Sequence, residues 1–140
     1  MCITRLMRKF VKYKHARASI GGKKLHLLIA DSFPKHMLGL MHMRSIKESE
    51  GMLFIFSRNA YHGIWMRNML FPIDIIWLDE KFEVVDIVEN AEPCQSIFGC
   101  KTYMPISQAR YVIELNAGSS KKLGIKKGSR LIVEIAPGEN

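Results

Sequence analysis

The chain has 140 residues, enough for one domain with a sizeable core. Hydrophobic residues make up 48% of it and charged residues 24%, as in ordinary globular proteins. No apolar run reaches the ~18 residues that a membrane-spanning helix needs, and the N-terminal segment lacks the apolar stretch of a secretory signal. These features exclude an integral membrane protein and predict a cytoplasmic location.

The formal net charge of +8 is concentrated at the N-terminus. Residues 1–30 contain eight Lys or Arg and no Asp or Glu, whereas residues 31–140 contain thirteen residues of each sign. We therefore predict a basic N-terminal extension over residues 1–17. Apolar residues recur in it with the spacing of an amphipathic helix, at Ile3, Leu6, Met7, Phe10 and Val11. Such a helix could pack on the domain, or residues 1–24 could make weak contacts with a polyanion such as RNA or an anionic membrane.

Strand-like runs dominate the rest of the chain. A hairpin is predicted over residues 16–31, because Gly21-Gly22 allows the positive φ that tight turns need. A helix is predicted to begin near Ser32 and to extend over residues 35–43. The later predicted strands cover residues 51–57, 61–66, 73–78, 82–88, 109–118 and 129–137. They are separated by a long connection over residues 90–107 and a short helix and turn over residues 119–128.

Short strands at this density, with two or three short helices, are typical of small β domains. The predicted fold class is mainly β (α+β), a compact single-domain β-barrel or sandwich-like fold. The chain shows no internal repeat, low-complexity segment or linker. Residues 18–140 are therefore predicted to form one domain that follows the N-terminal extension.

Three segments together resemble a known family. They are GLMHMRSIKESEGMLFIF, IWMRNMLFPIDIIWLD and ARYVIELNAGSSKKLGIKKGSRL, and they occur in the order and at the spacing of the family catalogued as domain of unknown function 192. The similarity covers about residues 18–135 and implies a small, mainly β fold. The family has no established activity, so the resemblance implies no reaction. The matching positions are Gly39-Leu40-Met41, Arg44, Gly51-Met52-Leu53-Phe54, Trp65-Met66, Asn68, Pro72, Asp74 and Glu114.

Two carboxylates lie inside apolar strands. Asp74 stands in the run IDIIWL and Glu114 in YVIEL, so alternation would place both near the core. A buried carboxylate needs a cation or several N–H donors. Arg44, at the end of the predicted helix, is the expected partner in preference to Arg67, because a helix end lies near neighbouring strand ends, whereas Arg67 lies in a predicted loop open to solvent. The planar fork of Arg44 could hold a carboxylate through two hydrogen bonds. The predicted ligand-binding residues are Arg44, Trp65, Asn68, Asp74 and Glu114.

These residues favour a binding module for an unidentified small molecule or peptide. Two other functions stay open: an enzyme that uses Asp74 and Glu114 as an acid and a base, and an RNA- or membrane-surface-associated protein that acts through its basic arm. The carboxylates could also have a purely structural role, accepting hydrogen bonds from loop N–H groups. Whether the protein is an enzyme is thus left open.

Cysteine and histidine patterns indicate little further chemistry. Cys94 and Cys100 share the long connection and could form a local disulfide, or stay reduced in the cytosol. The five histidines lack metal-ligand spacing and no Gly-rich phosphate loop occurs, so neither a metal nor a cofactor is predicted. Several methionines are interpreted as core filler, namely Met37, Met41, Met43, Met52, Met66 and Met69.

Overall fold

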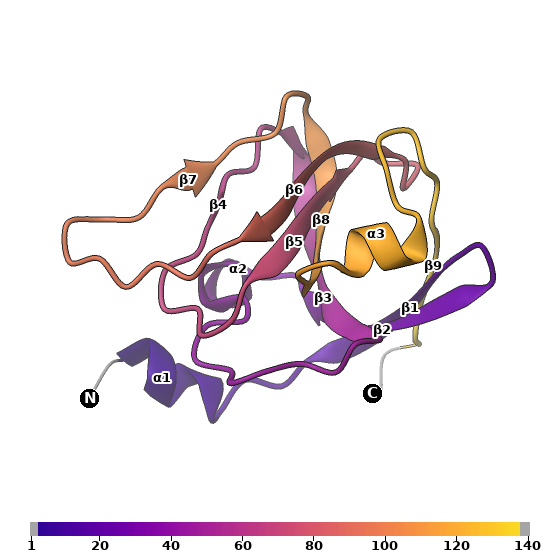
Figure 1. Ribbon diagram of the computed structural model, residues 1–140. Helices are drawn as coiled ribbons and strands as arrows, with labels where there is room; N and C mark the ends of the chain where they lie inside the picture. Colours follow the sequence, from indigo (N-terminus) through magenta and orange to yellow (C-terminus); the bar gives the residue numbers. More distant parts are fainter. Residues whose placement is uncertain (1–2, 138–140) are drawn as a thin grey trace.

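The computed structural model describes residues 3–137, which form three short helices and nine strands (Figure 1). The helices are α1 (Ile3–Arg8), α2 (Phe33–Leu38) and α3 (Ser119–Leu123). The strands are β1 (Lys14–Ile20), β2 (Lys23–Ala30), β3 (Glu50–Ala60), β4 (Ile64–Trp65), β5 (Ile73–Leu78), β6 (Val84–Ala91), β7 (Thr102–Tyr103), β8 (Ala109–Asn116) and β9 (Ile132–Ile135). The predicted mainly β fold with two or three short helices is confirmed.

Seven of these strands form one mixed sheet in the order β6-β5-β8-β3-β2-β1-β9, while β4 pairs with β7 in a separate ribbon. β2 and β3 are parallel, and the other neighbours in the sheet are antiparallel. Backbone hydrogen bonds between residues 82–84 and 128–131 link the two ends of the sheet. The sheet is not a closed barrel, so the sandwich-like shape is the predicted alternative that fits.

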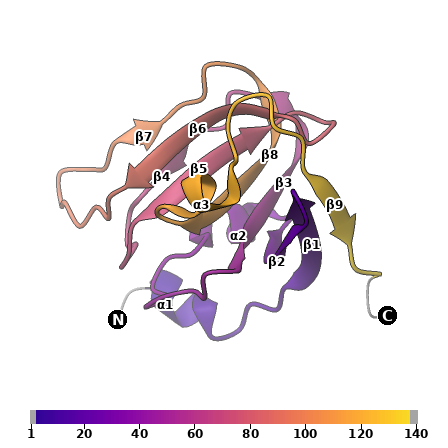
Figure 2. The same cartoon turned by 45° about the vertical axis from the view of Figure 1, so that its right-hand side comes forward.

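Both faces of the sheet are covered, and β5 is therefore buried along its whole length. α3 and the segment after it pack on one face (Figures 1 and 2), where the core includes Leu27, Ile76 and Ile113. The segment after α2 and the β4–β7 ribbon pack on the other face, around Phe54 and Trp77. Side chains that alternate along β5 thus enter two separate hydrophobic clusters.

Local sequence signals explain several boundaries. The β1–β2 hairpin turns at Gly21 and Gly22, both with positive φ as predicted. α2 ends at Leu38, earlier than predicted, because Gly39 adopts φ 48° and ψ −132°, outside the helical region. β1 begins at Lys14, so the first strand already starts within the predicted extension over residues 1–17.

α1 is attached to the segment that follows α2. The Nε of Arg8 donates a hydrogen bond to the carbonyl oxygen of Met41 at 2.8 Å, and a second guanidinium nitrogen donates to the carbonyl of Gly39. The Oγ1 of Thr4 lies 2.7 Å from Nε2 of His42. The described part of the extension therefore begins with a short helix that contacts the domain, while residues 1 and 2 lie outside the described range. No helix within residues 3–137 has the length and apolarity to cross a bilayer.

Candidate functional site

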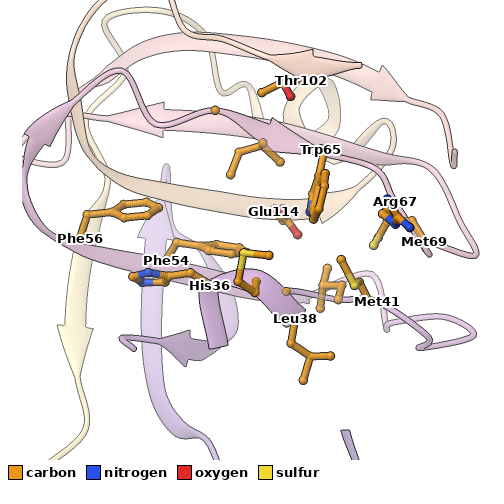
Figure 3. Close-up of a pocket in the computed structure, with 15 residues that line it drawn as sticks. His36, Leu38, Met41, Phe54, Phe56, Trp65, Arg67, Met69, Thr102 and Glu114 are labelled. Atoms are coloured by element: carbon orange, nitrogen blue, oxygen red, sulfur yellow. The ribbon is translucent and has the colours of Figure 1, made fainter. Parts of the chain in front are cut away.

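A pocket of about 280 Å³ opens between the α2 region and the β4–β7 ribbon (Figure 3). Its walls are mostly apolar, and three ionisable side chains line it: His36, Arg67 and Glu114. The lining residues are His36, Met37, Leu38, Gly39, Leu40, Met41, Phe54, Phe56, Gly63, Ile64, Trp65, Arg67, Met69, Thr102 and Glu114. Ligand pockets in proteins commonly combine such apolar walls with a few polar groups.

Glu114 supplies the buried polar group of this pocket. It lies on the central strand β8, between its cross-strand neighbours Met52 of β3 and Ile75 of β5, and is only 4% exposed. Its Oε2 has no hydrogen-bond partner within the described part of the chain. Burial raises the pKa of this carboxyl to about 8, because the ionised form loses its hydration. Glu114 is therefore mainly protonated at neutral pH.

Asp74 is also fully buried, but its hydrogen bonds are satisfied. Its Oδ1 accepts from the backbone N–H groups of Asn90 at 2.9 Å and Gly118 at 3.3 Å. Its Oδ2 accepts from both the N–H and the hydroxyl of Ser120, at 2.9 and 2.7 Å. This carboxylate therefore joins β5 to the end of β6 and to the start of α3 without any basic side chain.

The two predicted carboxylates do not converge. Asp74 is paired with Leu115 across β5 and β8, and Ile75 is paired with Glu114. Because neighbouring residues of a strand point to opposite faces, the side chains of Asp74 and Glu114 lie on opposite faces of the sheet. An acid and a base acting on one substrate must share a site, and this register does not bring the two groups together.

Arg44 is not the partner of either carboxylate, and that expectation was wrong. Its side chain is exposed, and none of the ion pairs among residues 3–137 involves Arg44, Asp74 or Glu114. α2 ends at Leu38, so Arg44 lies in the loop that follows the helix and not at its C-terminal end. Arg67 is exposed as well, with its Cζ 5.7 Å from the centre of the Trp65 ring.

Asn68 does not line the pocket but is bonded to segments next to it. It has φ 58°, its N–H donates to the carbonyl of Cys94, and its own carbonyl accepts from the N–H of His42. Its side-chain amide lies 3.9 Å from the sulfur of Met41. Of the five predicted ligand-binding residues, Trp65 and Glu114 line the pocket, whereas Arg44, Asn68 and Asp74 do not.

Sequence reasoning missed most of the lining residues. Phe54 and Phe56 alternate on one face of β3, which is a signal that the sequence offered. Met37, Met41 and Met69 were interpreted as core filler, yet they line the pocket. Methionine fills irregular spaces in cores and at binding surfaces alike, so its spacing alone could not separate the two roles.

Cys94 and Cys100 form a disulfide that closes the loop after β6. This loop is attached to the pocket rim. The N–H of Cys94 donates to the carbonyl of Met66 at 3.0 Å, and the backbones of Arg67 and Cys94 form an isolated parallel β-bridge. The disulfide therefore holds the segment that also contacts the strand carrying Trp65.

Replacing both cysteines by alanine is expected to lower the free energy of unfolding by about 2 kcal/mol, because the closed loop is short. Urea denaturation at pH 7 measures the change. Wild-type protein in dithiothreitol should show the same loss, and the double variant should not respond to the reductant. An unchanged midpoint of the wild-type protein under reductant would contradict this contribution.

Two similar proteins bear the name UPF0127. UPF0127 proteins from Thermococcus gammatolerans and Pyrococcus horikoshii are 31% and 32% identical over 103 and 108 residues. Each match covers 74% of this chain, but the chain spans only 63% of the Thermococcus protein, against 83% of the Pyrococcus protein.

Solved structures share the fold. A Sinorhizobium meliloti protein, provisionally described as a transcription regulator, matches with a TM-score of 0.78 and 30% identity over 88% of this chain and 96% of its own. A Novosphingobium aromaticivorans protein of unknown function matches with a TM-score of 0.73 and 25% identity, over 84% and 83%. A family model described as Uncharacterized ACR, DUF192, matches residues 16–133, and the chain therefore belongs to the uncharacterised family DUF192.

Proposed function

We propose that the protein is a binding module whose pocket takes a small ligand with an apolar body and one polar group that meets Glu114. The observation that carries this proposal is the buried Oε2 of Glu114, which lacks a hydrogen-bond partner within residues 3–137. A buried polar group left without a partner costs roughly 1–3 kcal/mol, so a ligand that supplies one recovers that energy. The volume of about 280 Å³ lies near the lower end of ligand pockets and favours a compact ligand.

The arrangement supports binding rather than catalysis. Besides Glu114, the ionisable lining residues are His36 and Arg67. The Nε2 of His36 lies 3.0 and 2.9 Å from the carbonyl oxygens of Ala30 and Ile55, so a ring N–H is engaged with the backbone. Asp74 is on the other face of the sheet. Within the described part of the chain, the pocket thus offers one buried carboxyl and no second acid or base paired with it.

The experiment is a screen of small neutral, anionic and cationic compounds against protein with ¹³C-labelled methionine methyl groups. Ligands in the pocket are expected to shift the signals of Met37, Met41 and Met69, which line it. Met37→Trp should weaken this binding, because the larger side chain narrows the pocket. Phe33→Trp, on the same helix but outside the pocket and 74% exposed, is the matched control and should not change it. If no compound shifts these three signals, the proposal fails.

A further inference from the structure

We infer that the polar group recognised at Glu114 is a protonated amine, so that the pocket binds small organic cations with an apolar body. This inference rests on the proposed binding function and names the class of its ligand. Two features of the pocket support it: the distribution of charge around Glu114, and the aromatic side chains that line the same space.

The buried ionisable group of the pocket is acidic. Among residues 3–137, Glu114 forms no ion pair, and Arg67, the only Lys or Arg that lines the pocket, is exposed beside the Trp65 ring. A protonated amine would supply both an N–H donor for Oε2 and the positive charge that allows the carboxyl to ionise. A buried carboxylate is tolerated when it is both paired and hydrogen-bonded.

Aromatic rings line the space next to this carboxyl. Figure 3 shows Trp65 close to Glu114, with Phe54 and Phe56 along the same pocket. Cations within about 6 Å of an aromatic face are attracted by the ring quadrupole, most strongly by Trp. A carboxyl group close to the Trp65 ring, in a pocket that Phe54 and Phe56 also line, therefore matches an ammonium group better than an anion, which both features would disfavour.

A neutral ligand is the competing class, because a protonated Glu114 could donate a hydrogen bond to a carbonyl or hydroxyl oxygen. The two classes differ in their proton balance. When an ammonium group binds, the carboxyl releases its proton to solvent and the ligand keeps its own, so one proton is released for each ligand bound. A neutral acceptor leaves the carboxyl protonated and releases none. The other charged or ionisable side chains that line the pocket are His36 and Arg67.

The test compares phenethylamine with 2-phenylethanol by isothermal titration calorimetry, in phosphate and Tris buffers at pH 7. Phenethylamine is expected to bind at least about tenfold more tightly and to release close to one proton. Its affinity should rise by up to about tenfold per pH unit between pH 6 and pH 7.5. Equal or tighter binding of 2-phenylethanol, or amine binding without proton release, would overturn the inference. These wild-type measurements do not depend on any variant.

Glu114→Gln provides the second arm, since it keeps the shape of the side chain but cannot ionise. It should lose at least about tenfold in phenethylamine affinity and all proton release, with 2-phenylethanol binding unchanged. Glu80→Gln, an exposed acid in the β5–β6 turn, is the matched control for unspecific cation binding and should leave both affinities unchanged. If neutral compounds alone occupy the pocket, only the amine assignment fails. If no compound of either class binds, the proposed function fails with it.

Discussion

Asp74→Asn is expected to lower the free energy of unfolding by about 3 kcal/mol, the largest effect of any single substitution considered for this chain. The carboxylate is fully buried and accepts four hydrogen bonds from Asn90, Gly118 and Ser120. An amide of the same shape turns one acceptor oxygen into an N–H donor. The new N–H donor would face the N–H groups or the hydroxyl that now donate to the carboxylate. These buried groups would then have no acceptor. Urea denaturation at pH 7 gives the change.

Asp79→Asn is the matched control for this substitution. Asp79 also accepts hydrogen bonds from two backbone N–H groups, those of Lys81 and Glu83, but it lies in the β5–β6 turn near solvent. Its replacement should cost less than about 1 kcal/mol, because water can take over the lost contacts. Similar losses for the two variants would mean that the bonds of Asp74 contribute little. Phenethylamine binding should survive in Asp74→Asn, since Asp74 lies on the opposite face from the pocket.

The second large effect is that Glu114 lowers the free energy of unfolding as the pH rises. Burial raises the pKa of this carboxyl in the folded state from 4.5 to about 8. Between these two values the folded protein keeps a proton that the unfolded chain has released, so folding binds a proton. The stability contributed by Glu114 is therefore fully present below pH 4.5 and falls by up to about 1.4 kcal/mol per pH unit until pH reaches about 8.

Denaturation curves of wild-type protein and Glu114→Gln, measured at intervals from pH 5 to pH 9, isolate this contribution, because the other titrating groups are common to both. The difference in unfolding free energy between the two proteins should change steadily up to about pH 8 and then level off. A difference that stays constant with pH would show that Glu114 has an ordinary pKa and is not held in an apolar environment. Phenethylamine at saturating concentration should flatten the slope, because the bound amine stabilises the ionised form.

Local patterns in the sequence were sufficient for the elements whose conformation depends on neighbouring residues. The paired glycines 21 and 22 supply the positive φ of the first hairpin turn. Apolar runs such as IDIIWL and YVIEL predict buried strands, and both are central strands of the sheet. Burial of Asp74 and Glu114 also follows from their positions in these runs. The mainly β class of the fold was therefore predictable from alternation and turn chemistry alone.

The tertiary structure decided what the two carboxylates do. Whether they share a face depends on the register of β5 against β8, and a shift of one residue would move an entire strand to the other face. Register arises from contacts between distant segments, which no local period encodes. The same holds for the hydrogen-bond donors around Asp74, because Asn90, Gly118 and Ser120 lie 16, 44 and 46 positions away in the chain.

The pocket likewise exists only in three dimensions. Its walls come from the α2 region, β3, the β4 segment, β7 and β8, which are far apart in sequence and meet because the β4–β7 ribbon packs on one face of the sheet. The sequence by itself determined that Glu114 would be buried and that Trp65 would stand near apolar neighbours. It could not determine that Arg44 would face solvent, or that the Oε2 of Glu114 would be left without a hydrogen-bond partner among the described residues, since both depend on where α2 ends and on which side chains reach β8.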